Sequence, residues 1–255
     1  MKKSNLLLLA LITVSSSLFF TGCESNTPID NQAQEIVDAA IQAHQAHLFE
    51  QSTIEFDFRG RHYRSTRDGG NYVYERIFSD STGTFHDSLS NNGFTRHQNG
   101  DLTKLAKKDA DSYSNSVNSV IYFVQLPYFL NDAAVNKTYL GTSEIKGQKY
   151  DKIKVDFREK GGGKDFEDEF IYWFHQDKKT MDYLAYNYQT DGGGARFRAA
   201  YNVRSVEGIR FADYINFKPA EKSNLDIETF DALYNEDALI EVSRIDSENV
   251  KVVLK

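Results

Sequence analysis

From about residue 53 apolar and polar side chains begin to alternate, which is the period of a β-strand with one buried face. In the run STIEFDF, Ile54, Phe56 and Phe58 alternate with acidic residues. The runs NYVYERIF, TGTFHDSL and GFTRHQ follow at short intervals, separated by the turn-forming sequences SDSTG, NNG and NGD. This rhythm predicts consecutive antiparallel hairpins.

Two long segments repeat their apolar residues every three or four positions and predict helices. The first spans residues 31–48, with Asp30 or Asn31 as its N-terminal cap. The second spans residues 102–126 and ends before a proline. Its last turns, VIYFVQL, are apolar on all sides, so this helix needs cover on more than one face.

The strands resume after this helix and end in an antiparallel α+β arrangement. In FIYWFH, aromatic residues occupy both faces, which indicates a strand that is covered on both sides or lines a groove. A short helix at 227–234 and a closing pair of strands at 238–245 and 249–255 complete the chain. The pattern predicts a curved antiparallel sheet, a half-barrel of about eleven strands, with two or three helices on one face.

The segment RFRAAYNVRSVEGIRFADYINFK predicts a hairpin whose register follows from matching its apolar faces. A three-residue loop ending at Gly208 places Phe197 opposite Phe217 and Tyr201 opposite Asp213. A two-residue loop would instead set apolar residues on the same face as charged ones. We therefore expect the three-residue loop.

This register leaves one carboxylate on an otherwise apolar face and sets Val203 opposite Phe211. Asp213 must find a donor there, and the hydroxyl of Tyr201 is the candidate. The alternative is that Asp213 contacts a ligand.

The beginning of the chain has the features of a secretory signal. MKKSN supplies positive charge, an apolar run follows, and small residues precede Cys23, the only cysteine. A leader that ends at cysteine resembles the bacterial lipobox, although Phe20 departs from its usual aliphatic residue, so an ordinary cleaved signal is the alternative. We expect residues 1–22 to be a lipoprotein signal peptide, Cys23 to carry the lipid, 23–30 to be a polar tether, and 31–255 to form one domain.

The charge and motif content point away from several functions. The formal net charge is −7, and removal of the leader takes away Lys2 and Lys3 but no acid, so a nucleic-acid partner is disfavoured. GGGK at 161–164 lacks the spacing of a phosphate loop, and no nucleophile motif is legible. We expect no cofactor, no metal and no enzymatic activity.

A cluster of arginines stands out in this acidic chain. FDFRGRHYRSTR places Arg59 and Arg61 on one strand face. These side chains either pair with nearby carboxylates or meet an anionic head group, which the arginine fork suits. The arginines available for that role are Arg59, Arg61, Arg64, Arg67, Arg196 and Arg198.

The order of these elements is similar to a known architecture. A lipidated N-terminus, an entry helix, a meander of strands and an apolar helix ending in LPYFL resemble the LolA/LolB-type half-barrel, which carries lipoproteins or lipids in Gram-negative envelopes. The segments FDFRGRHY, SVNSVIYFVQLPYFLNDAAV, FIYWF and DYLAYNY also resemble an uncharacterised family of bacterial envelope lipoproteins. The resemblance lies in layout, so it transfers no functional residue.

The sequence therefore supports three hypotheses. The first is a lipid-anchored envelope protein that binds an acyl chain, a lipid or a lipoprotein segment in an apolar concavity. The alternatives are an adaptor that binds an envelope protein and a hydrolase without a legible motif. The resemblance implies attachment to the outer membrane, facing the periplasm. The candidate ligand-binding residues are Phe56, Phe58, Arg59, Arg61, Tyr172, Phe174, Phe197, Tyr201, Phe211 and Asp213.

Overall fold

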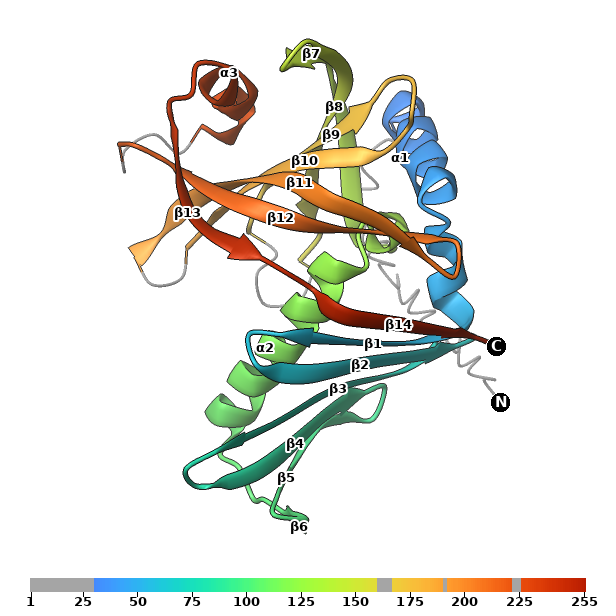
Figure 1. Ribbon diagram of the computed structural model, residues 1–255, viewed down its shortest axis with the longest axis vertical. Helices are drawn as coiled ribbons and strands as arrows, with labels where there is room; N and C mark the ends of the chain where they lie inside the picture. Colours follow the sequence, from blue (N-terminus) through green and yellow to red (C-terminus); the bar gives the residue numbers. More distant parts are fainter. Residues whose placement is uncertain (1–29, 160–166, 190–191, 222–225) are drawn as a thin grey trace, which may run out of the picture.

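The strands of the computed structural model form two antiparallel sheets of seven strands each within the described residues, which are 30–159, 167–189, 192–221 and 226–255 (Figure 1). Sheet A has the order β14-β1-β2-β3-β4-β5-β6, and sheet B has the order β13-β12-β11-β10-β9-β8-β7. Sheet A comprises β1 Ser52–Phe58, β2 Arg61–Asp68, β3 Asn71–Asp80, β4 Gly83–Ser90, β5 Gly93–Gln98, β6 Asp101–Leu102 and β14 Glu248–Leu254. Sheet B comprises β7 Val135–Ile145, β8 Gln148–Phe157, β9 Phe170–His175, β10 Met181–Tyr188, β11 Gly194–Val206, β12 Ile209–Pro219 and β13 Leu239–Ile245.

The last two strands join the two sheets. β13 pairs with β12 at the edge of sheet B, and β14 pairs with β1 at the edge of sheet A. The expectation that these two strands pair with each other was wrong, because the chain continues through Asp246 and Ser247 from one sheet to the next (Figure 1). The Ser247 backbone N–H donates to Asp213 Oδ1 over 2.9 Å, which ties this link to β12.

The first helical segment begins as predicted but ends earlier. Helix α1 (Asn31–Ala43) is capped by Asp30, whose Oδ1 accepts from the Ala33 N–H over 3.1 Å. The helix stops because Gln45 takes a left-handed conformation, with φ of 52°, and the chain continues as a 3₁₀ helix, η1 (Ala46–Gln51). His44, between the two, is buried.

Helix α2 (Lys107–Val124) lies against the inner side of sheet A and reaches toward sheet B (Figure 1). It begins five residues later than predicted, because Asp101 and Leu102 pair with β5 as β6. It ends before Pro127, as expected, and leads into a 3₁₀ helix, η2 (Tyr128–Asn131).

The main core lies between the sheets and is completed by helices α1 and α2. A second core covers the opposite face of sheet B, where η4 (Ile227–Thr229) and α3 (Phe230–Asn235) pack. Strand β9 lies between the two cores, and all six of its residues are buried. The expectation that this strand is covered on both sides is confirmed.

The β11–β12 hairpin has the predicted pairing at its base. Phe197 lies opposite Phe217, and Tyr201 lies opposite Asp213. The expected three-residue loop was wrong, since a two-residue turn at 207–208 joins the strands.

A bulge accounts for the difference. Between Tyr201 and Arg204 the register shifts, and Asn202 takes a left-handed conformation with φ of 46°. The bulge supplies the offset that the longer loop was expected to supply. As a result Phe211 lies opposite Arg204 rather than Val203.

Candidate functional site

A cavity of about 380 Å³ lies where the C-terminal half of α2 meets sheet B and the β13–β14 link. We call it the inner cavity. Its volume is within the usual range of a small-molecule pocket, roughly 300–1,000 Å³. It is lined by Phe58, Arg59, Ser119, Val120, Phe123, Val124, Tyr186, Arg198, Asn216, Ile245 and Ser247.

Helix α2 supplies the apolar wall of this cavity. Val117 and Ile121 are fully buried in the main core. Val120, Phe123 and Val124 are half-buried and line the cavity, at the three- and four-residue spacing of a second helix face. The all-round apolar character of this segment therefore serves two surfaces, the core and the cavity.

Sheet B supplies a charged group to the lining, next to the apolar residues of α2. Arg198 is 9% exposed, and its Nη2 donates to the Tyr186 hydroxyl over 2.8 Å. Its guanidinium carbon lies 4.0 Å from the centroid of the Phe123 ring. Its Nε is buried and has no hydrogen-bond partner. Among the described residues no carboxylate forms an ion pair with Arg198.

An amide stands directly beside this guanidinium. Asn216 is the cross-strand partner of Arg198 and is also 9% exposed. Its Nδ2 lies 3.3 Å from Ser243 Oγ, on the next strand, and its Oδ1 is buried without a partner. Arg198 and Asn216 both line the cavity, and each has one buried polar atom without a partner, although buried polar groups are normally satisfied.

The β1–β2 turn contributes the predicted pair Phe58 and Arg59 to the cavity lining. Arg59 and Gly60 both have positive φ, of 50° and 69°, which makes a two-residue hairpin turn. Arg59 is exposed, and its guanidinium carbon lies 5.0 Å from the centroid of the Phe58 ring.

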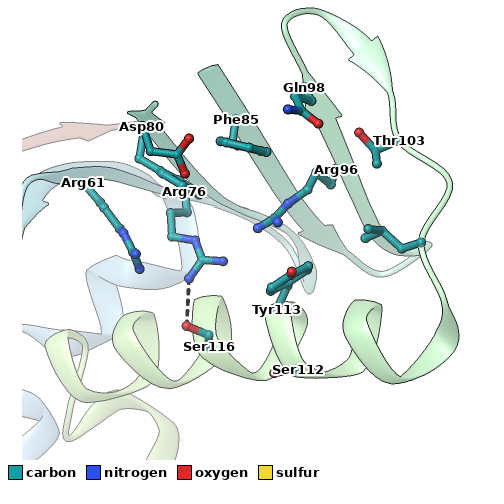
Figure 2. Close-up of a pocket in the computed structure, with 12 residues that line it drawn as sticks. Arg61, Arg76, Asp80, Phe85, Arg96, Gln98, Thr103, Ser112, Tyr113 and Ser116 are labelled. Atoms are coloured by element: carbon teal, nitrogen blue, oxygen red, sulfur yellow. Dashed lines mark hydrogen bonds between the residues drawn. The ribbon is translucent and has the colours of Figure 1, made fainter. Parts of the chain in front are cut away.

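A second cavity, of about 610 Å³, lies between the N-terminal half of α2 and strands β3–β5. We call it the arginine cavity, because Arg61, Arg76 and Arg96 line it (Figure 2). Their guanidinium carbons lie 4.8, 5.5 and 5.8 Å from the centroid of the Phe78 ring. Arg76 also donates through Nη1 to the Ser116 hydroxyl of α2, over 2.7 Å (Figure 2).

Two of these arginines share a buried carboxylate. Asp87 is fully buried and is the cross-strand partner of both Arg76 and Arg96. Arg76 Nη2 lies 2.6 Å from Asp87 Oδ2, and Arg96 Nε lies 2.5 Å from Asp87 Oδ1. These hydrogen bonds raise the pKa of Arg96 above its ordinary value. The two buried arginines of this cavity therefore have a carboxylate partner within the protein.

Apart from Phe58 and Tyr201, the predicted aromatic wall residues lie in the two cores. Phe56, Tyr172, Phe174 and Phe211 are buried in the main core and do not line the inner cavity. Phe197 lies on the opposite face of sheet B, in the second core. Since sheet B is buried on both faces, aromatic alternation did not indicate which face is inward.

The remaining predicted residues are separate from the inner cavity. Arg61 lies at the arginine cavity. Asp213 is satisfied by Asn202 Nδ2 over 2.6 Å, by Arg204 Nη1 over 3.1 Å and by the Ser247 N–H, rather than by Tyr201 as expected. The hydroxyl of Tyr201 donates to Asp246 instead.

Sequence reasoning missed the cavity residues of α2 and Asn216. The signal for α2 was the apolar segment VIYFVQL, whose second face was noted but not assigned to a cavity. The signal for Asn216 was the predicted hairpin register, because pairing Phe197 with Phe217 necessarily sets Arg198 opposite Asn216. Cys23, the expected lipidation site, lies outside the described residues.

Two further properties concern the described part of the chain. No group of three or more His, Cys, Asp or Glu side chains is placed there to hold a metal ion. None of the helices described is both long enough and apolar enough to cross a membrane.

Comparison with solved structures finds similar folds at low sequence identity. A DUF1329 family protein from Desulfovibrio piger aligns with a TM-score of 0.50 and 10% identity, over 86% of this chain and 92% of that protein. A LolA superfamily protein from Nitrosomonas europaea aligns with a TM-score of 0.48 and 12% identity, over 86% and 92% of the two chains. At such identity the first similarity indicates a shared fold alone.

Comparison with protein families is more direct. No functionally curated protein matches the chain. The model of a family of unknown function, DUF6503, matches residues 18–247, which is most of the sequence. The chain therefore belongs to the DUF6503 family.

Proposed function

We propose that this protein is a lipid-anchored envelope protein that binds the acyl chain of a hydrophobic ligand in the inner cavity. The observation that carries the proposal is the cavity itself, about 380 Å³ in volume, with an apolar wall formed by Val120, Phe123 and Val124 of α2. An acyl chain placed there would exchange contact with water for contact with these side chains, which is favourable in proportion to the apolar area buried.

The location completes the proposal. Acyl groups on Cys23 would attach the protein to the outer membrane, on its periplasmic side, and the tether would leave the folded part free to meet lipids or lipoproteins. The function is carriage or sequestration of a hydrophobic molecule, and it requires no catalytic group.

The test is uptake of single-chain lipids by the protein from Glu24 onward, which retains every described helix and strand. Native mass spectrometry after extraction of co-purified lipid, followed by titration with hexadecanol and hexadecanoate, measures the stoichiometry and the affinity. We expect one chain per protein for at least one of these probes. If the protein takes up neither hexadecanol nor hexadecanoate, the proposal is contradicted.

A pair of matched variants locates the bound chain. Val120→Trp places a bulky side chain in the cavity and should weaken binding by roughly tenfold or more, equivalent to about 1.4 kcal/mol or more. Asn118→Trp introduces the same side chain at an exposed position on the same helix and should bind like the parent. Equal binding by both variants would place the ligand elsewhere.

A further inference from the structure

Arg198 carries a charge that the described part of the protein does not balance. An arginine side chain stays protonated at all ordinary pH values, so it cannot become neutral when it is buried. Its hydrogen bond to the Tyr186 hydroxyl and its position over the Phe123 ring supply partial compensation only. Buried charges in proteins are normally paired, and burial of an unpaired charge is costly.

Arg198 lines a cavity whose wall is otherwise mostly apolar. Nε has no partner, and the neighbouring amide of Asn216 also has an unsatisfied atom. Arg198 lies opposite Asn216 in the β11–β12 pair, so a guanidinium and an amide from neighbouring strands line the same cavity. A guanidinium and an amide NH₂ both donate hydrogen bonds, and such a pair is suited to an oxyanion.

From this geometry we infer that the ligand of the inner cavity is an anionic single-chain amphiphile, whose carboxylate or phosphate group is bound by Arg198 and Asn216. The inference rests on the proposed function and names its ligand class. The chain of the ligand lies along Val120, Phe123 and Val124 of α2, and its head group lies against β11 and β12. Arg59, exposed at the cavity, adds a second positive charge to the lining.

The experiment compares head groups on a constant chain. Hexadecanoate, hexadecyl phosphate and hexadecanol are titrated into the delipidated protein at pH 8, below their critical micelle concentrations. We expect hexadecanoate or hexadecyl phosphate to bind roughly ten- to a hundredfold more tightly than hexadecanol, because only the anions form an ion pair with Arg198 in addition to hydrogen bonds. The tighter of the two anions identifies the head group.

The Arg198→Met variant should lose this preference while it still binds hexadecanol, because methionine keeps the wall apolar. Arg196→Met is the matched control: Arg196 lies two residues away on the same strand, is half-buried and does not line the cavity. It should keep the preference. Arg198→Lys, which retains the charge but lacks the fork, should show a reduced preference and serves if the methionine variant does not fold.

The outcomes separate the two proposals. Equal binding of anions and hexadecanol by the parent protein, or an unchanged preference in Arg198→Met, overturns the assignment of Arg198 while acyl-chain binding stands. Absence of binding for all three probes overturns the proposed function as well.

Discussion

The two cavities beside helix α2 each contain a buried arginine stacked on a ring of that helix, but only one of these arginines has a carboxylate partner among the described residues. In the arginine cavity, Arg96 lies over an α2 aromatic ring, with its guanidinium carbon 3.6 Å from the Tyr113 centroid. In the inner cavity, Arg198 lies in the same way over Phe123, ten residues further along the helix. Arg96 has a buried carboxylate partner in Asp87, and Arg198 has none among the described residues.

This difference indicates what each cavity is suited to do. In the arginine cavity Arg76 and Arg96 share the buried carboxylate of Asp87, so this triad holds β3, β4 and β5 together beneath α2. In the inner cavity the charge of Arg198 has no carboxylate partner among the described residues, and we propose that a ligand supplies one. Similar arginines beside one helix thus have a structural role on one side and, as we propose, a ligand-binding role on the other.

The largest expected effect comes from removing the shared carboxylate. Asp87→Asn preserves the shape of the side chain but leaves Arg76 and Arg96 buried without a counter-charge. We expect the free energy of unfolding to fall by about 3–5 kcal/mol, as for other broken buried ion pairs. Urea denaturation at pH 7 measures it.

The control for this variant is Asp80→Asn, at the exposed rim of the same cavity. It should change the free energy of unfolding by no more than about 0.5 kcal/mol. If Asp87→Asn changed the free energy of unfolding as little as Asp80→Asn, the ion pairs of Asp87 would not stabilise the fold, and the contrast between the two cavities would be wrong.

His44 is another buried basic residue, and unlike Arg198 it can become neutral. His44 is 2% exposed, and its Nε2 accepts a hydrogen bond from the Met181 N–H over 3.0 Å. Burial, together with the positive charge of Arg210, lowers the pKa of His44 from 6.5 to about 3. The ring is therefore neutral in the folded protein. Arginine cannot avoid the cost of burial in this way, because it stays charged.

The depressed pKa of His44 predicts a pH dependence of stability. Below pH 6.5 the unfolded chain binds a proton that the folded protein excludes, so stability is full above this pH and falls as the pH drops toward 3. Between pH 8 and pH 5 this single group should account for a loss of about 2 kcal/mol.

Two glutamine variants isolate that contribution. His44→Gln keeps an acceptor but cannot titrate, so urea denaturation at pH 8 and pH 5 should show a smaller difference than in the parent. His47→Gln, at an exposed position three residues away, should retain the difference. An unchanged difference in His44→Gln would mean that the ring is already protonated in the folded protein.

The sequence allowed much of the fold to be predicted, and the reasons are local. Alternation and turn residues indicated the hairpins, and the apolar segment before Pro127 indicated a helix covered on more than one side. The division into two sheets was not predicted, because local pattern does not show that β6 and β7, on either side of α2, belong to different sheets, or that β14 crosses over to pair with β1. The crossing is fixed in part by the contact of Ser247 with Asp213, which lies 34 residues earlier in the chain.

Contacts at the two cavities were predictable from the sequence only where short turns fix the strand register. Two-residue turns at 81–82 and 91–92 set Asp87 opposite both Arg76 and Arg96, so the buried triad could have been found from the turns alone. Phe197 was chosen over Arg198 as a wall residue, because both faces of sheet B are buried and apolar character does not distinguish them. That Arg198 has no carboxylate nearby among the described residues depends on the three-dimensional packing around it, which the local sequence pattern does not contain.

The smallest expected effect is on the stability of the ligand-free protein, and it is the sharpest test of the comparison. Arg198→Met removes a buried charge without exposing a counter-charge, and it loses only the bond to Tyr186 and the contact with Phe123. The free energy of unfolding should change by less than about 1 kcal/mol, or rise. Arg76→Met, which leaves Asp87 with one cation, should lose about 2 kcal/mol or more. Comparable losses in the two variants would mean that Arg198, like Arg76, already has its partner within the protein, and the inner cavity would then have no unbalanced charge to offer a ligand.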